Sequence, residues 1–244
     1  MKVEETVNRW FENAQNRMVQ ISQSDNNFTT SFCSVAISVM KTYCSAIGFL
    51  IDNEFRLPAM ALLRVISEFF VKFLWCIKPR NDVEVRNRFH SWENTTAEKK
   101  LNLFDGILKS KVGLNEQELT RINQLKDEAL KIKNSKRDRM PKITGKGSLF
   151  EEVSSFFGTD VSAPLYRQYC ATAHIDTSVL SGFLVPTDKG IGIKSDLDEN
   201  LAMLKDRCLN FAYMFLIVLY KMYGWDIENI KNEYEGTIDS PKDV

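Results

Sequence analysis

Apolar residues recur along this chain at intervals of three and four positions, which places them along one face of an α-helix. No stretch alternates cleanly between apolar and polar residues, the pattern typical of a half-buried strand. The apolar periodicity predicts helices at residues 3–22, 28–54, 57–78, 81–92, 96–110, 116–134, 148–157, 163–184, 196–223 and 226–235. We therefore expect an all-α fold.

Side chains that cap helix N-termini stand at several of the predicted starts. A Ser, Thr or Asn followed three positions later by an acidic residue is the capping-box pattern or a close relative of it. The pattern occurs at Thr95, Asn115, Ser148 and Ser195, and Ser162 precedes Pro164 in the first turn of another predicted helix. The breaks between helices are too short to be flexible linkers, so we expect a single helical domain over residues 1–244.

The helices differ in how much of their surface is apolar. Residues 57–77 and 208–220 are apolar almost all the way round, as expected for helices in the middle of a bundle. The segment 81–146 is polar and charged, with only weak apolar stripes. We expect it to be a peripheral helical insertion between core helices at about 1–78 and 148–235.

Charge and cysteine usage restrict the class of protein. Lys plus Arg and Asp plus Glu are equal at 32 each, so no global field attracts nucleic acid or an anionic membrane. The cysteines number five, an odd count, with no C-x-x-C pair, which argues against a disulfide framework, a zinc site or another metal centre. The most hydrophobic run, 211–220, is about half of the roughly 20 residues that a membrane span needs. We expect a cytoplasmic protein with no membrane partner and no cofactor.

Two opposite charges interrupt the apolar helix at 57–77. Arg64 and Glu68 lie four positions apart on one face and can form an ion pair. Because a buried charge without a partner costs several kcal/mol, these two side chains should find each other or a third group. Two interpretations remain open, a structural pair that fixes the position of the helix and a polar functional site inside the bundle.

A second stripe of polar residues lies on the predicted helix 163–184. Arg167 stands seven residues before His174, which is nearly two turns of helix. Tyr166, Cys170 and Ser178 are spaced from His174 in steps of four residues. Arg167 reaches toward the N-terminus, away from His174, whose Cα is about 10.5 Å along the axis. If both act on one phosphate, this stripe meets its copy in a second protomer, so catalysis would imply a homodimer. A histidine that only hydrogen-bonds to a carboxylate such as Glu68 remains the alternative.

The residues LLRVISEFFVKFLW (62–75) and LYRQYCATAH (165–174) resemble a family of bacterial all-helical proteins of unassigned function. That family combines an L-x-R-x-x-x-E helix with a later Tyr…Ser/Cys…His helix. The second stretch is also similar to the Arg-x(4–6)-His pattern of the HEPN superfamily of helical ribonucleases and toxins. Gln168 follows Arg167, where HEPN nucleases often have Asn or Asp.

The resemblance implies a helical bundle, a homodimer, and RNA cleavage without metal at the dimer interface. It implies that Arg167 contacts the phosphate in the transition state and that His174 is a general acid/base or a phosphate ligand. Glu68 would match the acidic residue that orients them from an earlier helix, and its pair Arg64 is a further candidate for the catalytic site. Tyr166, Cys170 and Ser178 would line the same site. A toxin or antiphage effector is the corresponding role, and a partner antitoxin is not identified by the sequence.

The sequence contains two further candidate sites. Arg86 and His90 lie four positions apart, so they are a rival Arg/His pair, and we expect them at the surface or rim. Residues 121–146 contain nine Lys/Arg against three acidic residues, among them Lys136, Arg137 and Arg139. Clustered positive charge binds a phosphate backbone, so this run is either a contact for RNA or a solvated helix face.

Two functions from different classes therefore remain. The first is a HEPN-like, metal-independent endoribonuclease that uses Arg167 and His174. The second is a non-catalytic helical scaffold or ligand-sensing module with a buried Arg/Glu/His network. No phosphate-binding loop, dinucleotide fingerprint, HExxH zinc motif or G-x-S-x-G elbow competes with them.

Overall fold

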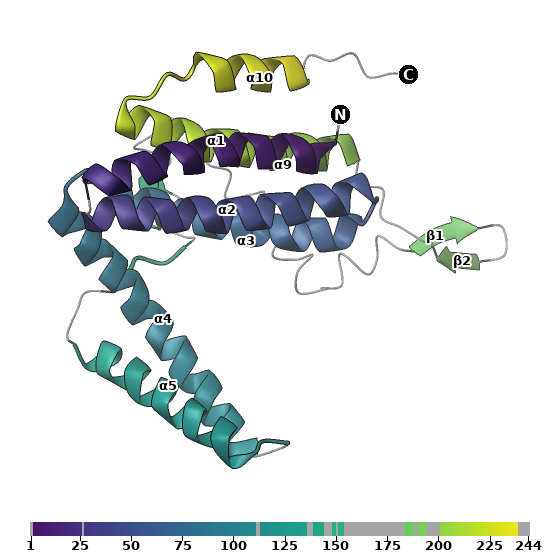
Figure 1. The fold of residues 1–244 in the computed structure, drawn as a ribbon. Coiled ribbons are helices and arrows are strands. Elements are labelled where there is room, and N and C mark those ends of the chain that lie inside the picture. Colours follow the sequence, from purple (N-terminus) through teal and green to yellow (C-terminus); the bar gives the residue numbers. More distant parts are fainter. Residues whose placement is uncertain are drawn as a thin grey trace.

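The computed structural model describes residues 2–25, 27–110, 113–135, 139–143, 148–149, 151–153, 184–187, 190–193 and 201–238. The elements in chain order are α1 (Val3–Ser24), α2 (Phe28–Asp52), α3 (Arg56–Ile77), α4 (Asp82–Ser110), α5 (Glu116–Asn134), β1 (Leu184–Thr187), β2 (Gly190–Ile193), α9 (Leu201–Tyr223) and α10 (Glu228–Ile238). The described part of the chain is helical apart from one short hairpin (Figure 1). The predicted all-α class is confirmed.

Helices α1, α2, α3 and α9 pack around one hydrophobic core (Figure 1). Phe215 of α9 lies at its centre, with ring centroids 6.0 Å from Phe11 of α1 and 4.9 Å from Phe73 of α3. Phe70 of α3 also packs on Phe215, at 6.4 Å. Each such aromatic side chain contributes about 1.5–3 kcal/mol when it is fully buried. The two helices that are apolar nearly all round, α3 and α9, thus supply the aromatic centre of the core.

The start of α1 lies directly on α2. A Cβ added at Gly48 would lie 2.7 Å from the backbone nitrogen of Glu4, so only a glycine allows this approach. Four residues later the Asp52 carboxylate accepts the backbone N–H groups of Val3 and Glu4, each at 3.2 Å. Asp52 therefore caps α1 from the neighbouring helix and satisfies donors that have no partner within α1.

Helices α4 and α5 form a hairpin that projects from the bundle, and we call it the arm (Figure 1). The first turns of α4 join the main core through Val85. Farther out, the arm has a small core of its own, formed by Ala97, Leu101 and Ala129 with Phe104 and Ile132 against it. The described part of the arm therefore has only a small apolar core of its own.

One predicted break is wrong, because α4 runs without interruption where we expected separate helices at 81–92 and 96–110. Thr95 is not a cap. Its hydroxyl donates to the carbonyl of Ser91, and the hydroxyl of Thr96 donates to that of Trp92, both at 3.0 Å. Such a bond to the carbonyl four positions earlier is how a threonine is accommodated inside a helix.

An antiparallel pair, β1–β2, begins at residue 184 and continues into the predicted break, with Leu184 opposite Ile193 and Thr187 opposite Gly190. Residues 163–183 of the predicted helix lie outside the described residues, as does the part of the helix at 148–157 beyond residue 153. At Leu184 the prediction is wrong, because this residue begins β1. Among the described helices, α2 alone is long and apolar enough to cross a membrane by those two criteria. In the bundle, α2 packs against α1, α3 and α9.

Candidate functional site

Three charged side chains follow one another along one flank of α3, and we call Arg64, Glu68 and Lys72 the charged stripe. The Lys72 ammonium donates to Glu68 Oε1, and Arg64 Nη2 lies 3.9 Å from Glu68 Oε2. The predicted ion pair between Arg64 and Glu68 is therefore confirmed. Lys72 was not among the predicted site residues, although its four-residue spacing from Glu68 places it on the same face of the helix.

The charged stripe is only partly solvated. The side chains of Arg64, Glu68 and Lys72 are 27%, 20% and 14% exposed. The ammonium of Lys72 also lies over the ring of Trp92 in α4, 5.5 Å from its centroid, and Phe69 packs on the same ring. The stripe is thus a half-buried array in which one carboxylate contacts two cations, and the formal charges of these three described side chains sum to one positive charge.

The other residues predicted for the catalytic site lie outside the described residues. These are Tyr166, Arg167, Cys170, His174 and Ser178, and the same holds for Lys136 and Arg137 of the basic run. Their predicted roles stay predictions.

Arg139 and part of the basic run are described, and they pair with carboxylates of the arm. Arg139 Nη2 donates to Glu98 Oε1 at 2.7 Å, and Lys133 lies 3.8 Å from the same oxygen. Lys126 Nζ lies 2.7 Å from Asp105 Oδ1. The hydrogen bond from Lys126 is the main reason why the pKa of the Asp105 carboxyl is lowered. These three cations therefore fasten α5 and the segment after it to α4.

Arg86 and His90, the rival pair, each contact a different carboxylate. Nδ1 of His90 lies 2.7 Å from Glu93 Oε2, with the His90 side chain 28% exposed. Arg86 Nη2 reaches back to Asp82 Oδ2 at 3.4 Å, and its guanidinium covers the ring of Phe28. The structure thus engages Arg86 and His90 separately, at the partly exposed positions that we expected.

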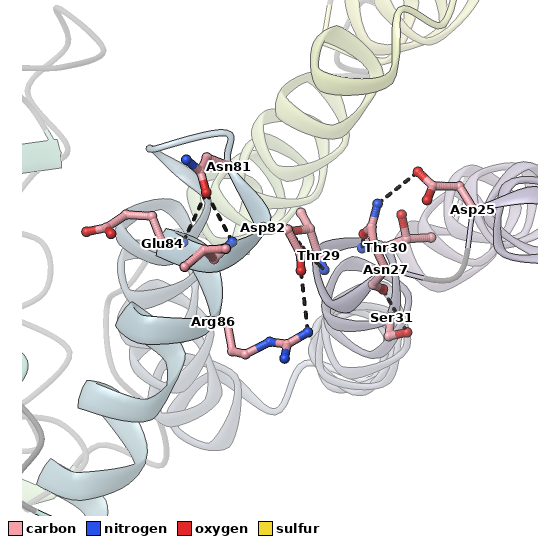
Figure 2. A network of polar contacts seen from close by, with 10 residues as sticks. Asp25, Asn27, Thr29, Thr30, Ser31, Asn81, Asp82, Glu84 and Arg86 are labelled. Atoms are coloured by element: carbon pink, nitrogen blue, oxygen red, sulfur yellow. Dashed lines mark hydrogen bonds and ion pairs between the residues drawn. The ribbon is translucent and has the colours of Figure 1, made fainter.

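Asp82 lies at the junction of α2 and α4 (Figure 2). Its carboxylate accepts from the backbone N–H and the hydroxyl of Thr29, at 2.7 and 2.8 Å. The hydrogen bond donated by the backbone N–H of Thr29 is the main reason why the pKa of Asp82 is lowered, and the charge of Arg86 lowers it further. Asn27 caps α2 and Asn81 caps α4 on either side of this contact (Figure 2). We interpret the junction as structural, because each polar group in it caps or joins helix starts.

The described cysteines cannot act as nucleophiles in the folded protein. Cys33, Cys44, Cys76 and Cys208 are all buried. Burial raises the pKa of Cys33 and of Cys76 to about 12, and the nearby Cys208 thiol together with burial raises that of Cys44. Within the described ranges, no group of three or more His, Cys, Asp and Glu side chains is placed to hold a metal ion.

Comparison with known proteins gives one match. Residues 36–191 match DUF5677, a family of unknown function, over well more than half of the chain. The chain belongs to this family. The match contains both α3 and the segment with Arg167 and His174, and it leaves out α1, α9 and α10. No curated protein and no solved structure matches the chain. This match agrees with the expectation of a family of unassigned function, and the likeness to HEPN nucleases stays a prediction.

Proposed function

We propose that this DUF5677 protein is a metal-independent endoribonuclease of the HEPN type that acts as a homodimer through Arg167 and His174. The observation that carries the proposal is the charged stripe on α3. It lies within the same family-matched region as Arg167 and His174. The L-x-R-x-x-x-E and Tyr…Cys…His elements of the resemblance thus both lie within the region that matches the family.

The composition of the charged stripe favours an anionic ligand. A pair that only fixed the position of α3 would need one cation for Glu68, whereas Arg64 and Lys72 both approach it. The second cation leaves a net positive charge at a half-buried position, where charge is less screened than in water. This is the sign and the setting that an RNA phosphate requires.

The two reacting side chains supply the minimum chemistry for RNA cleavage. The 2′-oxygen attacks the adjacent phosphorus while a base takes its proton, and the 5′-oxygen leaves as it receives a proton. The products are a 2′,3′-cyclic phosphate and a 5′-hydroxyl end. An imidazole that titrates near neutrality serves for the proton transfers, and a guanidinium stabilises the charge on the phosphoryl oxygens. In this scheme His174 transfers protons, Arg167 contacts the phosphate, and Glu68 positions them.

The test is cleavage of a mixed RNA pool in EDTA by wild type, His174→Ala and Arg167→Ala, with His90→Ala as matched control. We expect wild type to cleave and His90→Ala to remain active. His174→Ala and Arg167→Ala should lose about 100-fold or more, because general acid–base groups contribute that much, with unchanged helical content and melting temperature. Inert wild-type protein, cleavage that requires metal, or activity retained by His174→Ala would contradict the proposal.

A role as a toxin or antiphage effector follows from the same chemistry. A free endoribonuclease damages the cell that makes it, so expression of wild type should slow bacterial growth and expression of His174→Ala should not. Equal growth with both would argue against this role.

One observation favours a non-catalytic scaffold or ligand-sensing module as the second candidate. Glu68 is neutralised by neighbours on its own helix, which is sufficient for a purely structural network. In that case His174→Ala would lower the melting temperature, and no variant would change RNA integrity.

A further inference from the structure

We propose that a cleft formed by α1, the end of α9 and α10 binds a nucleobase. The cleft has a volume of about 570 Å³, within the range of small-molecule sites. Helix α10 packs against α9 and runs beside it (Figure 1). Its residues Asn229, Ile230, Asn232 and Glu233 line one side of the cleft. All of its lining residues lie outside residues 36–191, so the cleft belongs to the part of the chain that the DUF5677 match leaves out. The inference does not depend on the proposed ribonuclease activity.

Four asparagine carboxamides line this cleft, two from each side. Asn13 and Asn16 lie one turn apart on α1, and Asn229 and Asn232 lie one turn apart on α10. None of the four forms a side-chain hydrogen bond to another residue of the described ranges, whereas Asn27 and Asn115 cap helices. All four asparagines are exposed to solvent at the cleft. Each carboxamide offers two donors and an acceptor, so the cleft presents groups of both kinds to a ligand that displaces water.

The acidic side chains of the cleft accept hydrogen bonds from other groups of the protein. Glu233 Oε2 accepts from Trp10 Nε1 at 2.8 Å and from Arg9 Nη2 at 2.9 Å. Asp226 accepts the backbone N–H of Glu228 at the start of α10. Arg17, Asp226 and Glu233 line the cleft, and Arg9, which is not a lining residue, forms an ion pair with Glu233. With Arg9 included the formal charges balance, which favours a ligand without a strong charge of its own.

Arg17 provides a flat surface on which a base can stack. Its guanidinium lies over the rings of Tyr220 and Trp225, 5.3 and 5.7 Å from their centroids. Guanidinium planes and aromatic rings are the surfaces on which proteins stack unpaired bases. The lining rings of Trp10 and Tyr220 are only 1% and 5% exposed, so they offer no open face to a sugar. A planar, uncharged group with donors and acceptors along its edge fits this cleft, and carboxamides read such edges in pairs.

The base can belong to a free nucleoside or to single-stranded RNA, and one titration series separates the two sources. Calorimetric titrations of the full chain would use adenosine, guanosine, cytidine and uridine, their 5′-monophosphates, six-residue homopolymeric RNA oligonucleotides, and glucose as a sugar control. We expect at least one nucleoside or oligonucleotide to bind. A free nucleoside that binds alone identifies the first source, and an oligonucleotide that binds at least tenfold more tightly identifies the second. The 5′-phosphate should add less than threefold.

Variants place the binding in the cleft. Asn13→Ala combined with Asn232→Ala should weaken binding at least tenfold, and Arg17→Lys, which keeps the charge but loses the plane, should weaken it severalfold. Asn102→Ala, which replaces an exposed asparagine of the arm, should leave it unchanged. The proposal is overturned if no nucleoside or oligonucleotide binds at its solubility limit, if the cleft variants bind like wild type, or if glucose binds as well as the nucleosides.

Discussion

Gly48 is the residue at which α1 and α2 come closest, and it allows a direct prediction. A Cβ there would lie 2.7 and 2.8 Å from the backbone nitrogen and Cα of Glu4. Backbone atoms cannot move aside as the tip of a side chain can, so Gly48→Ala must push α1 outward. We expect it to lower the free energy of unfolding by about 1–3 kcal/mol, the usual effect of overpacking. Urea denaturation followed by circular dichroism measures this.

The matched control for this substitution is Gly106→Ala in α4. Nothing lies within 4 Å of the Cβ that it would add, and the position is inside a helix. Alanine is a better helix former than glycine by about 1 kcal/mol, so this variant should be as stable as wild type or slightly more stable. Equal destabilisation by both substitutions would show that contact with α1 is not the cause.

Asp82 makes the stability dependent on pH. Because its carboxylate accepts two bonds from Thr29, its pKa is lower in the folded protein than the ordinary value of 3.8. The folded state therefore binds its proton less readily than the unfolded state. The resulting stability is complete above about pH 3.8 and is lost as the pH falls below that value toward the folded-state pKa.

Asp82→Asn should therefore lower the melting temperature at pH 7, and the difference from wild type should shrink as the pH is lowered from 4 to 2.5. The hydrogen bonds of a charged acceptor contribute about 1.5–3 kcal/mol, of which the amide oxygen of Asn retains a part. Glu84→Gln is the control, since it removes a charge from the same first turn of α4 without touching Thr29. A difference that stays constant with pH would contradict the assignment of this effect to Asp82.

At the scale of elements, the arm should unfold without the bundle. Its own core contains only Ala97, Leu101 and Ala129 as buried residues, so it has far less buried apolar surface than the four-helix core. Leu101→Ala removes the largest of them, and a Leu-to-Ala change at a buried site costs about 2–5 kcal/mol. We expect faster hydrogen exchange in the outer half of α4 and in α5, with α1, α2, α3 and α9 unchanged.

The comparison for this experiment is Leu103→Ala, two positions along the same helix. Leu103 is 59% exposed, so its removal should leave exchange in the arm as it is in wild type. If Leu101→Ala raises exchange in the bundle as much as in the arm, the two do not open independently.

The elements were predictable from the sequence where local patterns decide. Periodicity located α1, α2, α3, α5, α9 and α10 to within a few residues, and the capping box at Asn115 and Glu118 is present. Thr95 was wrongly predicted as an N-cap, because a threonine before an acidic residue fits a cap and a helix interior equally well. The strands β1 and β2 were missed since pairing depends on a partner segment and not on local alternation alone.

The candidate site follows the same rule. The pair Arg64–Glu68 was predictable because it depends on spacing within one helix. The bonds from Thr29 to Asp82 join residues 53 positions apart, and no periodicity in the sequence indicates which helix starts meet. The asparagines of the α1–α10 cleft are even farther apart in the sequence, since Asn13 and Asn232 come from opposite ends of the chain.

For the whole molecule, the prediction of one domain over residues 1–244 still awaits a test, and the buried cysteines provide one. Cys33 and Cys44 of α2, Cys76 of α3 and Cys208 of α9 all belong to one continuous core. All four thiols are fully buried. Thiol reagents react with the thiolate form, and a pKa of about 12 makes this form rare at Cys33 and Cys76. Labelling at pH 8 therefore requires the core to open.

If the core opens as one unit, these four thiols should be labelled together. The labelling rate of each should be lower than in the unfolded chain by a similar factor. Mass spectrometry after timed exposure to iodoacetamide gives the rate for each cysteine, with Cys170→Ala used to leave only these four. Gly48→Ala should accelerate all four by the factor that corresponds to its loss of stability, about tenfold for each 1.4 kcal/mol. Leu101→Ala should accelerate none of them, because the arm lies outside this core. Labelling of Cys76 far ahead of Cys208 would show instead that α3 and α9 separate before the rest, and that the bundle is not one cooperative unit.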